Sequence, residues 1–153
     1  MLAPGTPAPD FDLPCGGGRT ARLADYRGKH TVVVYFYPKD DTPGCTAESC
    51  SFRDSHEDFV GAGAVVIGIS RDSVESHDRF SGKHKLPFLL ASDRDGKVAE
   101  AYQVGKSFLG LLPGRVTYVI DRQGMIRDAF SSQLRVKTHV ERALDLVRSL
   151  EAK

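Results

Sequence analysis

Two cysteines five positions apart are the residues of this chain best placed to do chemistry. Cys45 and Cys50 follow an apolar run, TVVVYFY, and the turn TPG stands directly before the first cysteine. Thr42 is expected to cap a helix that begins at Pro43, which makes Cys45 the third helical residue. The unpaired N–H groups and the positive end of the dipole at a helix start favour an anion. This position therefore suits a reactive thiolate.

The residues before Cys45 predict a small pocket that is rich in hydrogen-bond donors. Pro43 removes one N–H group that would otherwise be unpaired, and Gly44 lets a ligand approach the backbone closely. Thr42 can turn its hydroxyl back over the same turn. The alternative is that TPG is merely a good helix start and Cys45 a small core residue, because free cysteine is among the most buried residue types.

The spacing of the two cysteines argues against a static structural disulfide. At about 100° per residue, Phe52 and Phe59 lie within roughly 40° of Cys45 around the helix. Cys50 lies about 140° away, and its Cα atom would be about 9 Å from that of Cys45 in an intact helix. Because disulfides rarely tolerate more than about 7 Å between Cα atoms, the two cysteines cannot bond while the helix stays wound.

The elements that position these residues follow from the apolar pattern. Strands are expected at 31–37, 64–70, 88–91, 115–121 and 125–131, the first covered on both faces and the last two forming a hairpin around 121–124. Helices are expected at 43–61, from the cap Asp72 to about 83, at 96–102 and at 136–150. The last helix is amphipathic, with one apolar face made by Val140, Ala143, Leu144 and Val147.

This order predicts an α/β fold with a central mixed β-sheet flanked by helices. It has the plan of a single-domain thioredoxin-like protein over residues 1–153, although the order alone does not distinguish that plan from other small α/β folds. A chain of 153 residues is long enough to bury one core without disulfides.

Composition and charge narrow the possible functions. The chain has 21 Lys and Arg against 20 Asp and Glu, so no basic stripe for nucleic acid and no polybasic run for a membrane surface is expected. The longest apolar runs are too short to span a bilayer, and no signal peptide is visible. With three cysteines, a reducing cytoplasm is the simplest compartment, where paired cysteines are more often catalytic or redox-sensing than structural.

The other reactive groups predict no separate site. The five histidines are scattered without metal-ligand spacing. Cys45, Cys50 and His56 lack a fourth ligand, and the two cysteines diverge on the helix, so no metal is expected. Cys15 lies in no motif and is interpreted as a bystander thiol.

Residues 38–50 resemble the signature of the peroxiredoxins. Residues 38–45 match the Pro-xxx-Thr-xx-Cys motif of that family. The spacing from Cys45 to Cys50 is similar to that of the peroxiredoxin Q group, also called bacterioferritin comigratory proteins. The similarity runs from about residue 5 to about residue 150, and its further matches are at 66–70, 72–77, 86–88 and 114–121.

The resemblance implies a thiol peroxidase of thioredoxin-like fold that acts on hydrogen peroxide and organic hydroperoxides. Cys45 would be the peroxidatic cysteine, and Cys50 the resolving cysteine of the same chain. Thioredoxin or a similar dithiol protein would return the electrons, and the family needs no cofactor. Because resolution within one chain needs no dimer, a monomer is expected. The implied peroxide-binding residues are Pro38, Thr42, Pro43, Gly44 and Arg115.

Thr42 and Arg115 would be the polar partners of Cys45 in that reaction. As the thiolate attacks one peroxide oxygen, negative charge moves to the other, and fixed donors stabilise this transition state. Arg115 suits that role because its guanidinium is a rigid fork that stays charged. Without the resemblance, an arginine at the start of a strand after Pro113-Gly114 would be interpreted as a solvated surface residue.

Two rival functions remain open from the residues alone. A disulfide reductase or isomerase usually carries Cys-x-x-Cys, which this chain lacks, and would reduce insulin without consuming peroxide. A non-catalytic holdase or binding module of the same fold would show no fast thiol oxidation. The joint presence of Cys45, Thr42 and Arg115 argues against the holdase.

Overall fold

A five-stranded mixed sheet forms the centre of the computed structural model, which describes residues 1–107, 112–113, 115–131 and 136–151. The strand order is β5-β4-β3-β8-β9. β3, β4 and β5 are parallel to one another, whereas β8 is antiparallel to both β3 and β9. The predicted mixed sheet and its hairpin are therefore confirmed. The strands are β3 (Thr31–Phe36), β4 (Ala64–Ser70), β5 (Leu89–Ser92), β8 (Val116–Ile120) and β9 (Ile126–Ser131).

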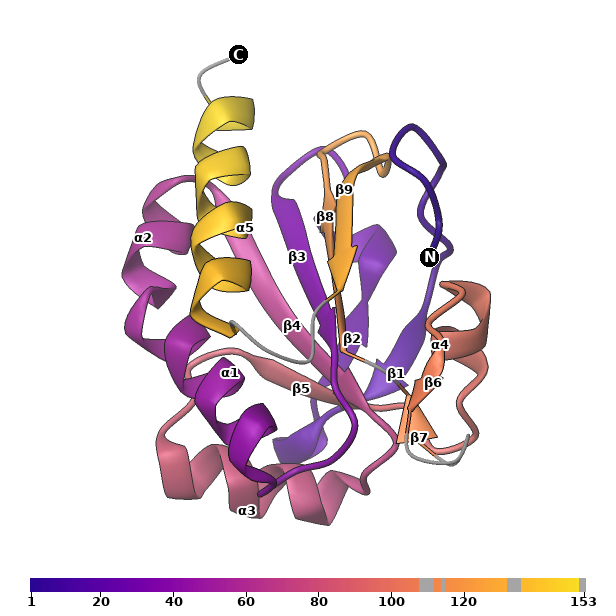
Figure 1. Cartoon of the computed structure of the whole chain (residues 1–153), viewed down its shortest axis with the longest axis vertical. Helices are drawn as coiled ribbons and strands as arrows, with labels where there is room; N and C mark the ends of the chain where they lie inside the picture. The colour runs from indigo at the N-terminus through magenta and orange to yellow at the C-terminus, as the bar shows by residue number, and fades with distance from the viewer. Residues whose placement is uncertain (108–111, 114, 132–135, 152–153) are drawn as a thin grey trace.

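The two faces of the sheet are covered by different elements (Figure 1). One face carries α1 (Pro43–Asp54), α2 (His56–Gly61) and α5 (Val136–Glu151). The other carries α4 (Lys97–Ala101), the turns η1 (Gly16–Gly18) and η2 (Leu23–Tyr26), and the small sheet of β1 (Asp12–Pro14) and β2 (Thr20–Arg22). α3 (Val74–His84) packs against β5 and η1, and β6 (Lys106–Ser107) pairs with β7 (Leu112–Pro113).

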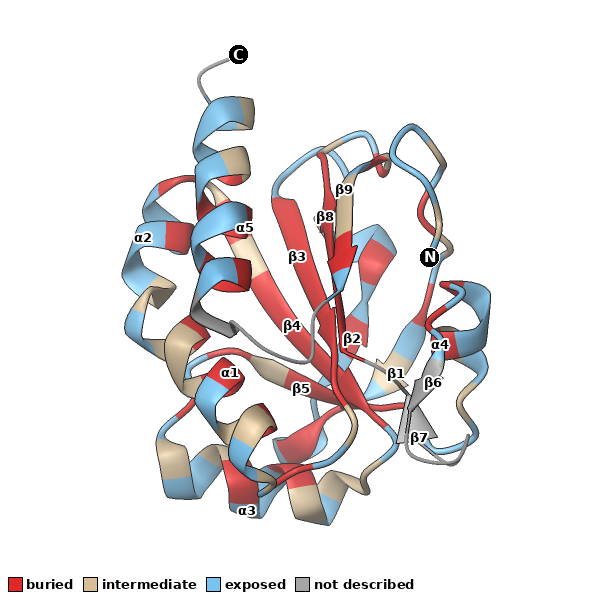
Figure 2. Ribbon diagram, in the orientation of Figure 1, coloured by how far each residue is buried: buried red, intermediate tan, exposed pale blue. Residues whose placement is uncertain are grey.

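The position of β3 in the centre of the sheet explains why apolar and polar residues do not alternate in its sequence. Successive side chains of a strand point to opposite faces. Val33 and Tyr35 join the core under α1, α2 and α5, while Val32 and Val34 join the core on the other face. Every residue of β3 is buried (Figure 2), so both faces need apolar side chains, as the run TVVVYF predicted.

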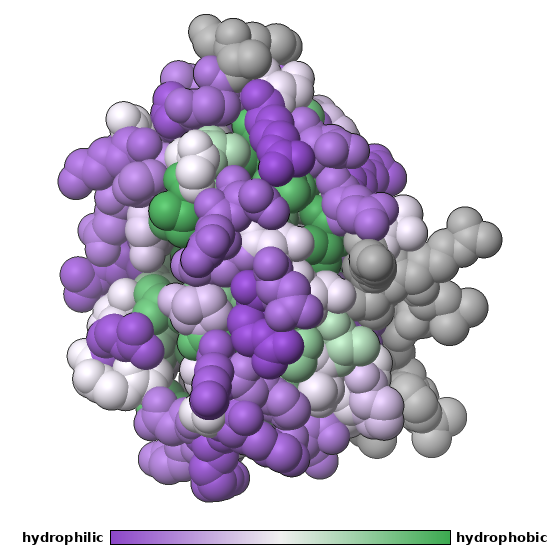
Figure 3. All heavy atoms as spheres, turned by 90° about the vertical axis from the view of Figure 1, so that its left-hand side faces the viewer, coloured by the Kyte–Doolittle hydropathy of each residue, from purple (hydrophilic) through white to green (hydrophobic). Residues whose placement is uncertain are grey.

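α5 has the predicted amphipathic pattern, with Val140, Ala143, Leu144 and Val147 all buried against the sheet. The surface over α1, α2 and α5 is mostly hydrophilic, with smaller apolar areas between the polar side chains (Figure 3). Within the described part of the chain, no helix has the length and apolar character needed to cross a membrane.

The expected single helix over 43–61 is wrong in one respect, because it breaks at Ser55. Ser55 has φ −101° and ψ 5°, and it separates α1 from α2. The two helices have different main neighbours, since α1 packs chiefly on α5 and α2 chiefly on β4. The C-terminal end of α1 is also tied to α3, because Arg53 Nη1 donates to the carbonyl oxygen of His84 at 2.9 Å. These tertiary contacts override a locally unbroken helical pattern.

The expected cap of α3 is also wrong by one residue. Ser73, not Asp72, caps α3, and its hydroxyl accepts a hydrogen bond from the N–H of Ser76 at 3.1 Å. The Asp72 carboxylate instead accepts hydrogen bonds from the hydroxyl of Ser70 and from the N–H of Asp40. Asp72 therefore links β4 to the loop that precedes α1.

Candidate active site

Cys45 lies in the first turn of α1, as the sequence predicted. Thr42 occupies the N-cap position with an extended backbone, and Pro43 is the first helical residue. The N–H groups of Gly44 and Cys45 have no partner within the helix, whereas that of Thr46 donates to the carbonyl oxygen of Thr42 at 2.8 Å. The side chain of Cys45 is 1% exposed, whereas Thr42 and Gly44 are half-buried and Pro43 is exposed. The rim of the site is therefore open to solvent, while its sulfur is not.

Arg115 meets Cys45 although 70 positions separate them in the chain. β3 pairs with β8 so that Phe36, the last residue of β3, lies opposite Val116. The loop to α1 leaves the sheet at the same end, so Arg115 comes to lie beside the helix start. Its Nη2 donates to the Cys45 Sγ at 3.3 Å, and Arg115 is only 5% exposed. The interpretation of Arg115 as a solvated surface residue is wrong.

Glu48 fixes the other arm of the Arg115 fork. Arg115 Nη1 donates to Glu48 Oε1 at 2.7 Å, and the Glu48 side chain is fully buried. Burial raises the pKa of the Glu48 carboxyl to about 7, although the adjacent Arg115 lowers it. Two nitrogens of one rigid guanidinium are thus bound to two side chains of α1, which fixes the orientation of Arg115 toward the sulfur.

Glu48 was missed by the sequence reasoning, although its spacing carried a signal. Residues three apart on a helix share a face, so Glu48 lies beside Cys45, and Phe52 continues the same face one turn later. All three are buried. A carboxylate within a buried helical face requires a cationic partner, and that requirement alone could have indicated an arginine behind Cys45.

His139 of α5 lies against the far side of Glu48. Its Nδ1 is 4.0 Å from Glu48 Oε2, and neither atom has a hydrogen-bond partner among the described residues. Burial lowers the pKa of His139, and the charges of Arg115 and Arg142 lower it further. The neutral imidazole is therefore favoured, so the charge of Glu48 is balanced by Arg115 and not by the histidine.

Gly44 and Thr42 have roles that differ in detail from those predicted. A Cβ atom on Gly44 would lie 3.0 Å from Arg115 Nη2, so the close approach that needs glycine here is that of the arginine itself. The Thr42 hydroxyl makes no capping bond to α1 and donates to the carbonyl oxygen of Lys39 at 2.9 Å. With its proton engaged, the Thr42 oxygen is left as an acceptor.

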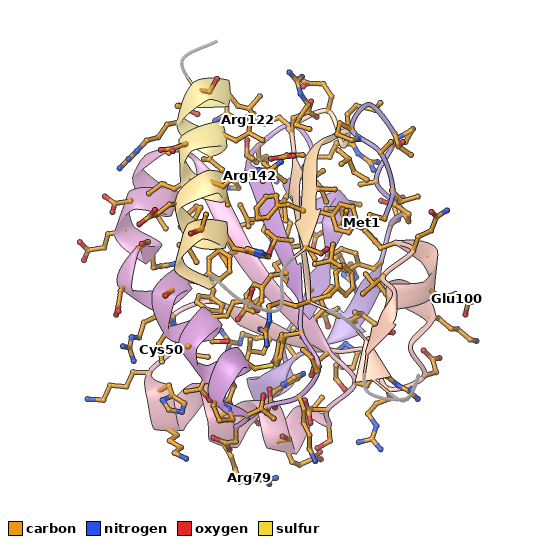
Figure 4. All side chains as sticks on the ribbon, viewed as in Figure 1. Met1, Cys50, Arg79, Glu100, Arg122 and Arg142 are labelled. Atoms are coloured by element: carbon orange, nitrogen blue, oxygen red, sulfur yellow. The ribbon has the colours of Figure 1, made fainter. Side chains whose placement is uncertain are left out.

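Among the described residues, the hydrogen bond to the sulfur of Cys45 comes from Arg115, and Pro38 and Cys50 lie elsewhere on the loop and the helix. Pro38 is half-buried in the loop between β3 and α1. Cys50 is half-buried on α1 (Figure 4), and it remains a free thiol, as do Cys45 and Cys15. Burial raises the pKa of Cys15 to about 11, although Arg19 lowers it, so this thiol stays protonated and unreactive near neutral pH. Gly114, part of the matched segment 114–121, lies outside the described residues.

Among the described residues, one group of side chains gathers as closely as metal ligands do. Atoms of Asp40, Asp72 and His77 lie within 4.8 Å of one another. These atoms already have hydrogen-bond partners. His77 Nδ1 is 2.8 Å from Asp40 Oδ2, and Asp72 Oδ2 accepts from the Ser70 hydroxyl at 2.6 Å. The group is a closed hydrogen-bond network and not a site prepared for an ion.

A thioredoxin-like fold in which a helix start holds a buried cysteine against an arginine defines a thiol-based oxidoreductase. Comparison with known proteins identifies the family within that class. The AhpC/TSA family model matches residues 4–129. Peroxiredoxin Bcp of Bacillus subtilis is 46% identical, over 97% of this chain and 97% of its own length.

Two solved structures have the same fold. The crystal structure of peroxidoxin BcpB from Mycobacterium tuberculosis gives a TM-score of 0.90 at 35% identity, covering 98% of this chain and 99% of that one. The bacterioferritin comigratory protein of Xanthomonas campestris, in a structural study of its alkyl peroxide reduction, gives 0.84 at 34% identity and covers 92% of each chain. The chain belongs to the AhpC/TSA family, in its peroxiredoxin Q and Bcp group, and is a thiol-dependent peroxidase that works through a peroxidatic cysteine.

The buried carboxyl of Glu48 makes a prediction for the pH dependence of stability. Its pKa rises on folding from an ordinary 4.5 to about 7, so the folded state holds more protons between those values than the unfolded state. The contribution of this group is complete below pH 4.5 and is lost as the pH rises to 7, with a slope of up to about 1.4 kcal/mol per pH unit. Glu48→Gln should remove this slope in denaturant unfolding between those pH values. Equal slopes in the two proteins would contradict the assignment.

Proposed function

We propose that Cys45 is the peroxidatic cysteine and that it reduces hydrogen peroxide and small organic hydroperoxides. The observation that carries the proposal is the contact of 3.3 Å between Arg115 Nη2 and Cys45 Sγ at the start of α1. A guanidinium there stabilises the thiolate before the reaction and the departing oxygen during it. The alkyl peroxide activity studied for the Xanthomonas campestris relative supports the inclusion of organic hydroperoxides.

In the first step, the Cys45 thiolate attacks the nearer peroxide oxygen. The S–O bond forms as the O–O bond breaks, and the other oxygen leaves with the electron pair as hydroxide or alkoxide, which takes up a proton. Arg115 and the N–H groups of Gly44 and Cys45 lie where that charge develops, and the Thr42 oxygen can accept the peroxide O–H. The product is a sulfenic acid at Cys45.

In the second step, the Cys50 thiol attacks the Cys45 sulfenic sulfur. A disulfide forms and the oxygen leaves as water. Helical geometry puts the two Cα atoms about 9 Å apart while α1 stays wound, so this step requires the first turns to open. A sulfenic acid lacks the full negative charge that the helix dipole attracts, and the opening is therefore favoured after oxidation.

A dithiol protein of the thioredoxin kind then reduces the Cys45–Cys50 disulfide. The chain would act as a single thioredoxin-like domain over 1–153 and as a monomer, because both reacting cysteines belong to the same chain. A reducing compartment such as the cytoplasm is proposed, because paired cysteines there are more often catalytic than structural. No nucleic acid or membrane partner is proposed.

Coupling the protein to thioredoxin, thioredoxin reductase and NADPH tests this function. Addition of hydrogen peroxide or an organic hydroperoxide should start NADPH oxidation that depends on the protein. The matched assay omits peroxide and offers insulin as a disulfide substrate. Insulin reduction with no peroxide consumption would support the reductase alternative instead, and a lack of both activities would support the holdase.

Removing the resolving thiol should separate the two steps. Cys50→Ser is expected to react with one equivalent of peroxide and then stall as a sulfenic acid that is prone to over-oxidation to sulfinic acid. In the wild-type protein, the oxidised form should show less helix by circular dichroism and faster amide exchange at residues 43–52 than the reduced form. A proven Cys45–Cys50 disulfide with unchanged helicity would refute the proposed opening of α1.

A further inference from the structure

The loop that leads from β3 into the site is held in an unusual conformation. Asp41, one residue before the cap Thr42, has φ +61°, which a residue other than glycine adopts at a cost. The preceding Asp40 is only 6% exposed, although it carries a charge and lies in a loop. Aspartate tolerates this backbone region better than most residues do, but a buried charged side chain in a loop requires partners that hold it in place.

The Asp40 carboxylate is bound from three directions. Its Oδ1 accepts from the Tyr37 hydroxyl at 2.6 Å, and its Oδ2 accepts from the Ser76 hydroxyl at 2.8 Å. Oδ2 is also 2.8 Å from His77 Nδ1. Burial tends to raise the pKa of Asp40, but the hydrogen bonds from His77, Tyr37 and Ser76 lower it overall. Asp40 is therefore an ionised carboxylate, tied to the first turn of α3.

The second nitrogen of His77 is bound to the sheet. Its Nε2 is 3.1 Å from the carbonyl oxygen of Ala91 in β5, while its Nδ1 faces the Asp40 carboxylate. The side chains of Asp40 and His77 are 3% and 1% exposed. Removing His77 would leave the buried Asp40 carboxylate without one of its hydrogen-bond partners, which is strongly unfavourable.

The other ionic contacts between α3 and this loop are made by Asp41 and are weaker. Lys83 Nζ lies 3.2 Å from Asp41 Oδ1 with both side chains more than half exposed, and His84 Nε2 lies 3.8 Å from the same oxygen. Exposed ion pairs contribute about 0 to 1 kcal/mol because water screens them. Among the described ionic contacts of the loop, the pair of Asp40 and His77 is therefore the one able to fix its position.

We propose that His77 is a positioning residue for the peroxide reaction, acting through Asp40 on the loop that carries Thr42 and leads to Cys45. The idea rests on the proposed role of Cys45 as the nucleophile. His77 touches neither peroxide nor sulfur. It holds the loop that sets the positions of Thr42 and of the helix start relative to Arg115, and displacement of a reacting group by about 1 Å can cost roughly 100-fold in rate.

The two chemical steps should respond differently when this pair is removed. Attack on peroxide needs the wound α1 and the ordered loop, so its rate constant should fall in His77→Gln by roughly 10- to 100-fold. Disulfide formation needs α1 to open, so its rate constant should not fall. Because the chain has no tryptophan, both steps are best followed by rapid quenching, thiol alkylation and mass spectrometry, which count sulfenic acid and disulfide separately.

A double-mutant cycle tests whether His77 acts through Asp40. Asp40→Asn should slow the peroxide step to a similar extent, and the double variant should be no slower than the slower single variant. Lys83→Ala is the matched control, since it removes the exposed contact to the neighbouring Asp41 and should react as the wild type does. If His77→Gln does not fold, Ser76→Ala removes one hydrogen bond from the same carboxylate and should show a smaller decrease.

The outcomes separate this proposal from the proposed function. A wild-type protein whose Cys45 does not react with peroxide would overturn the proposed function. If the wild-type protein reacts normally, the positioning role is overturned when His77→Gln has a lowered melting temperature but an unchanged rate of attack on peroxide. Additive losses in the double-mutant cycle, or equal slowing of both chemical steps, would also overturn it.

Discussion

Replacing Cys45 with serine is expected to abolish peroxidase turnover while the protein still folds. A serine hydroxyl is not ionised near neutral pH and is a poor nucleophile toward peroxide oxygen. The substitution changes one atom, and the Oγ of serine can still accept the hydrogen bond from Arg115 that Sγ accepts at 3.3 Å. The coupled assay with thioredoxin, thioredoxin reductase and NADPH measures turnover, and circular dichroism measures the fold.

Cys15→Ser provides the matched control for that experiment. Cys15 is also buried, but it lies on the opposite face of the sheet, in the core that includes Phe11 and Ala21. Its loss should leave turnover unchanged. Substantial turnover in Cys45→Ser, or its loss in Cys15→Ser, would mean that another sulfur reacts with the peroxide.

Arg115→Lys is expected to slow the reaction with peroxide by about 100-fold or more, the usual cost of losing one fixed donor to a developing negative charge. Lysine keeps the positive charge but has no planar fork, so it cannot bind Glu48 and Cys45 with two nitrogens in a fixed geometry. The decrease should appear in the second-order rate constant for oxidation of Cys45.

An exposed arginine serves as the control for this substitution. Arg122 pairs with Glu151 at the surface, with side chains 40% and 46% exposed, and Arg122→Lys should leave the rate constant unchanged. If Cys45 of the Arg115→Lys protein is oxidised as fast as Cys45 of the wild type, the positive charge alone is sufficient for the reaction with peroxide. The bidentate geometry would then have no catalytic role.

The secondary structure was largely predictable because the apolar pattern of each element is local. The run 31–37 lacks alternation since β3 is covered on both faces, and the pattern of α5 matches its buried side. The break at Ser55 was not predictable, because no proline or glycine marks it. It arises from the separate packing of α1 and α2, which a local pattern does not contain.

The contacts of the site were predictable only in part. The helix start around Cys45 follows from its own sequence, through Thr42 and Pro43. The partnership with Arg115 came from the resemblance to the peroxiredoxins, since it depends on pairing between β3 and β8 across a long stretch of chain. Spacing along one helix could have indicated Glu48, whereas no local signal indicates that His139 of α5 would lie against it.

The network around Asp40 shows the same limit in a different way. Asp40 and His77 are 37 positions apart, and each is an ordinary polar residue when considered alone. Their pairing appears only when α3 packs beside β5, where the Ala91 carbonyl meets the second nitrogen of His77. Buried polar pairs of this kind depend on tertiary packing, so the sequence pattern predicts the elements but not the contact.

The most direct test of the whole account is to map the sulfurs after a single reaction with peroxide. The reduced wild-type protein is mixed with one equivalent of hydrogen peroxide, remaining thiols are alkylated, and the peptides are analysed by mass spectrometry. The account predicts a disulfide between Cys45 and Cys50, with Cys15 alkylated as a free thiol. A disulfide that includes Cys15, or oxidation of Cys50 with Cys45 still reduced, would contradict it.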